Sequence, residues 1–380
     1  MSEHYYSPTR LPVSSYVAKG DGGLDTGMTD SERVGTDVKL HGGATLGDVA
    51  ARAGVSISAV SRVLSKAPSA RVSDATRQRI VEAARELNYR PNFAGRALKS
   101  ARTQVIGLVV PDLTNALFTE LMHGAEDEAA AHGYTLLLGH ADETRPGGDV
   151  IARLIGEGRV DGMVVQVGDG VPTTGLGELL ASGAPIVLIN SSYPGHPGSV
   201  TLDDQAGARM ATEHLLSLGH TRIAFANGLP RSFTAKRRRL GYHAAMTAAG
   251  LTVAKGYETR FGYAPENGWT ALERLLAQVV PPSAVVVANV NAAVGMLAAA
   301  RAGGLRVPDD LSVVAVHDSW TAENTWPPLT AVKMQFYAMG RTAVRGVIAR
   351  IESGVSVDVV ITNPAPELVQ RDSAAPVRHR

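Results

Sequence analysis

Short runs of valine, isoleucine and leucine recur after residue 104, and longer segments with a helical period separate them. Such fully apolar runs are typical of strands buried on both faces of a sheet, and their alternation with helices is typical of parallel α/β folds. We expect two α/β lobes with a ligand cleft between them, outside the carboxyl ends of the strands. The two series of strands are VIGLVV (105–110), YTLLLG (134–139), GMVVQV (162–167) and PIVLIN (185–190), then RIAFAN (222–227), AVVVAN (284–289) and LSVVAV (311–316).

The length and composition limit the class of protein. A chain of 380 residues is long enough for two or three domains. Cysteine is absent, which excludes disulfide scaffolds, cysteine nucleophiles and thiolate zinc sites, and fits a reducing cytoplasm. Residues 1–18 lack the apolar core of a secretory signal, and the uncharged stretch 275–300 is interrupted by a Pro-Pro pair and asparagines. We therefore expect a cytoplasmic protein that makes no membrane contact.

The charge is distributed unevenly along the chain. Residues 41–103 hold eleven lysines or arginines and four acidic residues, a net charge of +7, whereas the whole chain carries only +1. A compact basic segment ahead of a mildly acidic body is typical of a polyanion-binding head on a different kind of domain. A solvated basic face would give the same count, so charge alone leaves both interpretations open.

The basic segment also has the pattern of three short helices. Thr45, Ser56 and Ser73 can each cap the start of a helix, and Gly54 can make the turn between the first two. This is the pattern of a helix-turn-helix, although three short helices also occur in unrelated bundles. The side chains expected to face inward are Leu46, Val49, Ala50, Ala53, Val60, Val63, Leu64, Ile80, Val81, Ala84 and Leu87.

The second of these helices carries side chains suited to reading DNA. Arg62 can make a bidentate contact to guanine, and Ile57 can contact a thymine methyl group. Serine and threonine hydroxyls can bond phosphate oxygens. The competing interpretation makes Arg62 part of a surface salt bridge. The candidate DNA-binding residues of this segment are Thr45, Ser56, Ile57, Ser58, Ser61, Arg62, Ser73 and Thr76.

Many motifs along the chain follow one order. They are DVA, AGVS, VSRVL, VSDATR, YRPN and RALK in the basic segment, then IGLVVPDLTNALF, RVDG, ATEHLLSLGHTRIAF, GLRVPDDLSVVAV, PPLTAV and MGR. On these motifs, residues 45–372 resemble the lactose-repressor (LacI/GalR) family of bacterial transcription regulators. The resemblance implies a helix-turn-helix head, a hinge, and a core with the type I fold of periplasmic sugar-binding proteins.

The resemblance further implies that the segment after YRPN, Phe93 to Lys99, forms a hinge helix on DNA, with Asn92 just before it among the DNA-binding residues. Leu98 matches the leucine that wedges into the minor groove at the operator centre, and Arg96 and Lys99 flank it. Gly95 departs from the usual alanine and weakens this helix by roughly 1 kcal/mol. Without DNA the segment is a plain linker. Because a wedge at the operator centre needs a partner copy, we expect a homodimer on a palindromic operator.

The resemblance places an effector pocket in the cleft. Arg238 matches an arginine that grips a sugar hydroxyl or a carboxylate in relatives, although it stands within a run of four basic residues. Aromatic and methionine side chains at such positions belong more often to an ordinary core than to a pocket. Both interpretations, core and effector pocket, therefore stay open for them. The other residues expected at the effector are Leu117, Phe118, Asn190, Tyr263, Asn289, Val290, His317 and Met334.

Two departures from the family pattern bear on the effector. Val290 replaces the aspartate that accepts sugar hydroxyls, and Met334 replaces a glutamine at the pocket. Polyol hydroxyls would then be left unpaired, which disfavours a sugar effector. A less polar molecule, for example an anionic one held by Arg238, suits this set better.

The motifs of several enzyme classes are absent. The sequence has no glycine-rich phosphate loop, HExxH or GxSxG, and its histidines lack metal-ligand spacing. We therefore expect no enzymatic activity, no cofactor and no metal. The leading interpretation is a transcriptional repressor that a small molecule releases from its operator. A solute-binding or receptor protein is the alternative, but it would need a signal peptide and would have no use for residues 45–100.

These interpretations predict the following domain organisation. A disordered arm covers 1–44, with Met28 as an alternative start. The helix-turn-helix covers 45–91, the hinge 92–103, and the effector-binding and dimerisation core 104–380. Within the core, we expect one lobe at 104–202 and 334–360 and the other at 203–331 and 362–380.

Overall fold

The computed structural model forms two compact units, Met1–Pro91 and Asn92–Arg380, and each has its own hydrophobic core. Its described residues are 44–65, 72–90, 102–140 and 150–378, with gaps at 114, 167, 169–176, 178–179, 182, 194 and 357. The expected arm therefore lies outside the described residues except for Ala44, and the expected hinge except for Arg102 and Thr103.

The first unit is a three-helix head made of α1 (Leu46–Ala53), α2 (Ile57–Leu64) and α3 (Asp74–Glu86). Thr45 and Asp48 form a capping box at the start of α1, and Gly54 ends that helix in the left-handed conformation, with φ of 65°. The buried core comprises Val49, Ala50, Ala53, Val60, Val63, Ile80, Ala83 and Ala84.

The expected inward orientation of Val81 is wrong. Its side chain is 51% exposed, and Ala83 is buried in the third helix instead. The helical period explains the difference, since Ile80, Ala83 and Ala84 share one face at i, i+3 and i+4. Val81 follows Ile80 directly and therefore points away from that face.

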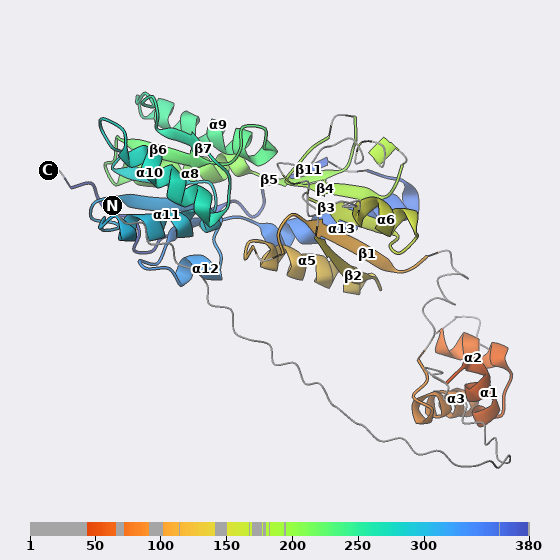
Figure 1. Cartoon of the computed structure of the whole chain (residues 1–380). Helices are drawn as coiled ribbons and strands as arrows, with labels where there is room; N and C mark the ends of the chain where they lie inside the picture. The colour runs from red at the N-terminus through yellow and green to blue at the C-terminus, as the bar shows by residue number, and fades with distance from the viewer. Residues whose placement is uncertain are drawn as a thin grey trace, which may run out of the picture. The chain divides into compact units, whose positions relative to one another are not determined.

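The second unit contains two lobes, each built on a six-stranded sheet (Figure 1). The first sheet has the order β11-β5-β4-β3-β1-β2, and the second has the order β12-β10-β9-β8-β6-β7. The strands of the first sheet are β1 (Val105–Val110), β2 (Thr135–His140), β3 (Gly162–Val165), β4 (Ile186–Ile189), β5 (Ser199–Leu202) and β11 (Asp358–Ile361). Those of the second are β6 (Ile223–Asn227), β7 (Glu258–Arg260), β8 (Ala284–Val287), β9 (Ser312–Val316), β10 (Thr330–Lys333) and β12 (Glu367–Val369).

This architecture confirms the expected α/β core of two lobes. Among the named strands of the described residues, every pairing is parallel except that of β10 with β12, which is antiparallel. Strands β3, β4, β6, β8 and β9 are buried at nearly every position, as their apolar runs predicted. No described helix is both long enough and apolar enough to span a membrane.

Helices cover both sheets. The first lobe has α5 (Phe118–Ala131), α6 (Val150–Gly156) and α13 (Phe336–Ser353). The second has α8 (Asp204–Ser217), α9 (Phe233–Ala248), α10 (Pro265–Leu276), α11 (Val290–Ala302) and α12 (Trp320–Glu323).

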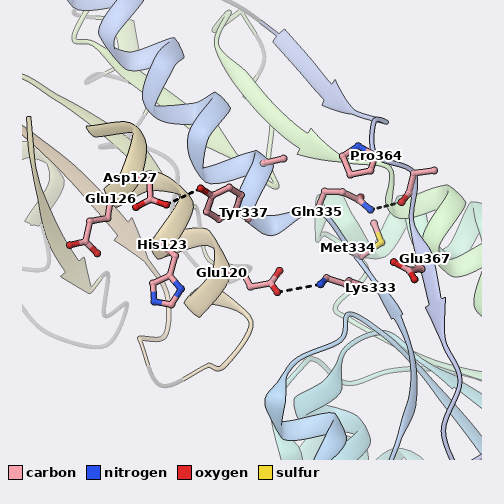
Figure 2. A pocket seen from close by; sticks show the side chains of 12 residues that line it. Glu120, His123, Glu126, Asp127, Lys333, Met334, Gln335, Tyr337, Pro364 and Glu367 are labelled. Atoms are coloured by element: carbon pink, nitrogen blue, oxygen red, sulfur yellow. Dashed lines mark hydrogen bonds and ion pairs between the residues drawn. The ribbon is translucent and has the colours of Figure 1, made fainter. Parts of the chain in front are cut away.

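The chain crosses between the lobes three times. The crossings lie between β5 and α8, between β10 and α13, and between β11 and β12. The last two are tied together, because Gln335 Nε2 donates to the Ala365 carbonyl oxygen at 2.7 Å. Lys333 also lies 3.8 Å from the Glu120 carboxylate, so an ion pair joins the end of β10 to α5 of the other lobe (Figure 2).

Glycines let pairs of helices pack backbone against backbone. A Cβ atom at Gly124 of α5 would collide with the Tyr337 carbonyl oxygen of α13, and one at Gly340 of α13 with that of Leu121. In the second lobe, a Cβ at Gly268 or Gly295 would clash in the same way between α10 and α11. These helices therefore lie closer than any larger residue at those positions allows.

The α5–α13 contact also contains a buried carboxylate. Glu128 is 3% exposed and accepts hydrogen bonds from Arg345 and Arg341, with N–O distances of 2.7 Å for each Nε. The Arg345 hydrogen bond outweighs burial, and with Arg341 it lowers the pKa of Glu128 from 4.5 to about 2.

Glu128→Gln should lower the free energy of unfolding by up to about 3 kcal/mol at pH 7, since the folded state favours the ionised form. The depressed pKa means that this stabilisation exists above pH 4.5 and is lost as pH falls toward 2. Urea unfolding of both proteins at pH 7 and about pH 3.5 checks this, because the difference should shrink at the lower pH. Glu213→Gln, at an exposed pair with Arg209, is the control and should cost less than about 1 kcal/mol. A pH-independent difference would contradict the assignment.

Candidate functional site

The head unit presents the outer face of α2 to solvent. Ile57 is 55% exposed although it is a large apolar residue, and Ser58 and Arg62 are exposed beside it. Arg62 Nε donates to the Ser58 carbonyl oxygen at 3.2 Å and forms no ion pair among the described residues. The geometry therefore leaves a guanidinium, hydroxyls and an apolar contact together on one helix face, as base readout requires.

Several candidate DNA-binding hydroxyls cap helices. Ser56 Oγ accepts from the Ala59 amide at 3.3 Å, and Ser73 Oγ accepts from the Thr76 amide at 3.3 Å. Thr45 caps α1 in the same way. Ser61 and Thr76 are half-buried. The candidate residues Asn92, Arg96, Leu98 and Lys99 lie outside the described residues.

A cleft of about 650 Å³ lies between the lobes of the second unit. Its walls combine amide, hydroxyl, charged and aromatic side chains from both lobes. The first lobe contributes Pro111, Asp112, Asn115, Leu117, Phe118, Gln166, Gly168, Asn190 and Phe336. The second contributes Leu229, Arg231, Ser232, Thr234, Arg238, Phe261, Gly262, Tyr263, Ala264, Pro265, Asn267, Asn289, Asn291 and His317.

Most of the effector residues expected from the sequence line this cleft. They are Leu117, Phe118, Asn190, Arg238, Tyr263, Asn289 and His317. Val290 and Met334 do not line it, and the structure corrects both expectations.

Helix capping explains the position of Val290. Asn289 accepts from the Ala292 amide at 2.9 Å and so begins α11, which directs Val290 into the core, where it is fully buried. Position 290 therefore offers no polar atom to a ligand, and the neighbouring Asn289 and Asn291 face the cleft instead.

Met334 belongs to a crossing segment. It is 2% exposed, and its sulfur occupies the space that a Cβ at Gly207 would need. It borders a second cavity of about 760 Å³ with Glu120, Lys333 and Tyr337 (Figure 2). Phe336, two residues further on, lines the cleft.

Arg238 has a hydrogen-bond partner at each of its three guanidinium nitrogens. It is 3% exposed, and its Nε donates to Asp204 Oδ1 at 2.8 Å. Nη1 donates to the Ala288 carbonyl oxygen at 2.8 Å, and Nη2 lies 3.0 Å from His317 Nε2. The guanidinium is 5.6 Å from the ring centre of Tyr263. One side chain thus joins α9 to α8, to the end of β8 and to the end of β9.

Burial is the main influence on the pKa values of Asp204 and His317, the two side chains that Arg238 contacts. Burial raises the pKa of Asp204, and Arg238 opposes that rise through its charge and hydrogen bond. Burial and then the charge of Arg238 lower the pKa of His317 well below 6.5, so its imidazole is neutral at pH 7. Because Asp204 compensates the charge of Arg238, the guanidinium is not a bare cation awaiting an anionic effector.

The sequence interpretation missed several cleft residues that follow strands. Asp112 stands just beyond β1, and Gln166 follows β3 directly. Their positions could have indicated them, since ligands in such sheets bind at the carboxyl ends of strands. The sequence position of Asp204 does not indicate its role, because that role depends on the ion pair that it forms from α8 with Arg238 of α9. Among the described residues, no group of three or more histidine or acidic side chains could hold a metal ion.

Each of the two units matches the model of a known protein family. Residues 45–92 match the model described as bacterial regulatory proteins, lacI family, and residues 212–374 match a periplasmic binding protein-like domain. The HTH-type transcriptional regulator DegA of Bacillus subtilis is 34% identical over 88% of this chain and 98% of its own length. The chain belongs to the lacI family. It is a DNA-binding transcription regulator, as its motifs indicated.

Solved structures of family members resemble the chain as well. A lacI-family transcriptional regulator from Mycobacterium smegmatis is 40% identical with a TM-score of 0.68, covering 71% of this chain and 99% of that one. The lac repressor dimer bound to operator and the anti-inducer ONPF is 26% identical with a TM-score of 0.74, covering 87% and 99%.

Arg238→Ala should lower the free energy of unfolding by about 3–5 kcal/mol, because the Asp204 carboxylate would stay buried without its partner. Thermal and urea unfolding measure the loss. Arg209→Ala, which removes an exposed partner of Glu213, is the matched control and should cost less than about 1 kcal/mol. Arg238→Met combined with Asp204→Leu should recover much of the loss. Equal stability of Arg238→Ala and the wild type would show that the pair does not brace the lobe.

Proposed function

We propose that this lacI-family regulator is a repressor that binds a palindromic operator as a homodimer and that a small molecule in the cleft releases it. The observation that carries the proposal is the exposed α2 face of the basic head, joined in one chain to a two-lobed core with a polar cleft. We assign it no catalytic role, and its site of action is the chromosomal DNA of the cytoplasm.

The proposed base-reading residues are Ile57, Ser58, Ser61 and Arg62 on α2. Ser56, Ser73, Thr76 and Thr45 stand at helix starts, where hydroxyls and backbone amides suit phosphate contacts. In the same proposal, Asn92, Arg96, Leu98 and Lys99 form the hinge that enters the minor groove.

Exposed apolar residues on the core support dimerisation. Leu137 and Leu138 on the edge strand β2 are 39% and 46% exposed. Trp320 of α12 and the nearby Trp326 are 65% and 83% exposed. Both β2 and α12 lie along the lower side of the core in Figure 1. Large exposed apolar side chains mark protein interfaces, and the lac repressor structure noted above is a dimer.

The release mechanism follows from the three crossings. An effector that binds both walls of the cleft favours one arrangement of the lobes, and this moves the hinge-bearing lobe relative to its dimer partner. The two hinges then no longer meet over the operator, and affinity falls.

The effector proposed here is not a simple sugar. Position 290 supplies no acceptor for a hydroxyl, since Val290 is apolar and fully buried. At the place where the family resemblance puts a hydroxyl acceptor, a polyol hydroxyl would therefore leave water without a partner and lose binding energy. Common hexoses and disaccharides should therefore leave the operator complex intact.

Selection of bound DNA from a random pool tests the DNA-binding proposal and should return a palindrome. Arg62→Ala should weaken binding to it by roughly 1–3 kcal/mol and relax the preference at one base in each half-site. Arg52→Ala is the control, because Arg52 pairs with Glu86 at 2.6 Å, and it should leave base preference unchanged. No enriched sequence, or equal loss of base preference in both variants, would overturn the proposal.

Light scattering tests the dimer. The wild type should have the mass of two chains at micromolar concentration, and Leu138→Lys should shift it toward one chain, because a charge would be buried at the interface. Val279→Lys is the control, since Val279 is fully exposed on a loop outside β2 and α12 and should leave the mass unchanged. A monomeric wild type would contradict the proposal.

A further inference from the structure

Asn190 and His317 occupy equivalent places in the two lobes. Asn190 directly follows β4 of the first sheet, and His317 directly follows β9 of the second. Both line the cleft, and they are only 9% and 3% exposed. A ligand between the lobes can therefore meet one of these side chains on each wall.

Both residues have a costly backbone conformation. Asn190 has φ of 50° and His317 has φ of 76°. Among the described non-glycine residues, only Asn88 and Gln104 share a positive φ. A non-glycine residue with positive φ is uncommon, and such residues cluster at functional sites. The chain holds two such residues on facing walls of one cleft.

His317 presents a hydrogen-bond donor of fixed position. Arg238 Nη2 can only donate, so His317 Nε2 accepts its hydrogen bond at 3.0 Å. The ring proton of the neutral imidazole therefore lies on Nδ1. No described residue bonds Nδ1, which leaves a buried N–H group without an acceptor.

Asn190 presents the complementary acceptor. Its Nδ2 donates to Gln166 Oε1 at 3.3 Å, and the carbonyl oxygen Oδ1 is the atom that remains. No described residue bonds this Oδ1 atom. A buried donor and a buried acceptor without partners are each unfavourable, and a ligand that supplies both partners removes both deficits.

The charged groups of the cleft balance. Asp112 of the first lobe is matched by Arg231 of the second, and Asp204 compensates Arg238. His317 is neutral. The cleft therefore has no excess charge of either sign to compensate the hydration that a charged ligand would lose, whereas an uncharged ligand avoids that loss.

We propose that the effector is an uncharged amide, whose carbonyl oxygen accepts from His317 Nδ1 and whose N–H donates to Asn190 Oδ1. The ligand thereby bonds both lobes at once. This inference rests on the proposed use of the cleft as the effector site. It narrows the effector from a general non-sugar molecule to one chemical class.

The test uses acetamide and acetate, which have nearly the same shape but differ in charge and in the N–H donor. Nitrogen NMR of histidine-labelled full-length protein should show His317 neutral, with its proton on Nδ1. Addition of acetamide should shift the His317 Nδ1–H signal in a saturable manner, while acetate at equal concentration should not. The signals of His214 and His220, outside the cleft lining, report any general solvent effect.

A matched pair of variants tests Asn190. Asn190→Gly keeps the backbone conformation accessible and removes the acceptor, so acetamide affinity should fall about tenfold. Asn88→Gly changes the other asparagine with positive φ, in the head unit, and should leave acetamide affinity unchanged.

Three results would overturn the proposal. They are a His317 proton on Nε2, the absence of any saturable acetamide shift, and an acetate shift as large as that of acetamide. Operator selection with the ligand-free wild type is measured separately. An enriched palindrome without an acetamide shift would reject the amide effector and leave the repressor proposal intact. A saturable acetamide shift without an enriched palindrome would reject the repressor proposal and leave the amide-binding site intact.

Discussion

The buried pair of Arg238 and Asp204 is the contact on which the effector lobe depends. The pair is almost inaccessible to water, so each charge relies on the other for its stability. The remaining Arg238 hydrogen bonds then fix the ends of β8 and β9, which form one wall of the cleft. They also determine which nitrogen of His317 carries the proton. A single ion pair thus supports the wall and sets its hydrogen-bonding pattern.

The two lobes have the same strand order, and the cavities lie where the chain crosses from one lobe to the other. Their sheets share a strand order, and in each the sixth strand arrives after the chain has crossed between the lobes. Side chains of the β10–α13 crossing divide between two cavities, since Phe336 lines the cleft while Met334, Gln335 and Tyr337 line the cavity of Figure 2. A change in lobe angle therefore alters both cavities together.

The sequence predicted the parts of the fold that have a strong apolar pattern. Interior strands such as β4 and β9 were visible as runs of buried residues, and the head was visible from its caps and motifs. Short strands such as β7 and β12 were not, because they have only three residues and mixed exposure. Likewise, the candidate cleft was predicted in outline. The errors at Val290 and Met334 arose because helix capping and chain crossing, rather than residue type, decide which way those side chains point.

The glycine contacts between helices have a mechanical consequence. Helices whose backbones touch have no compressible side-chain layer between them, so the α5–α13 and α10–α11 pairs each behave as one solid block. Flexing is then confined to the short crossings, at 203, 334–335 and 362–366. Gln335 ties the second of these segments to the third. A change in the angle between the lobes therefore has to be made in these few residues, because the helix pairs have no side chain that could yield between their backbones at the glycine contacts.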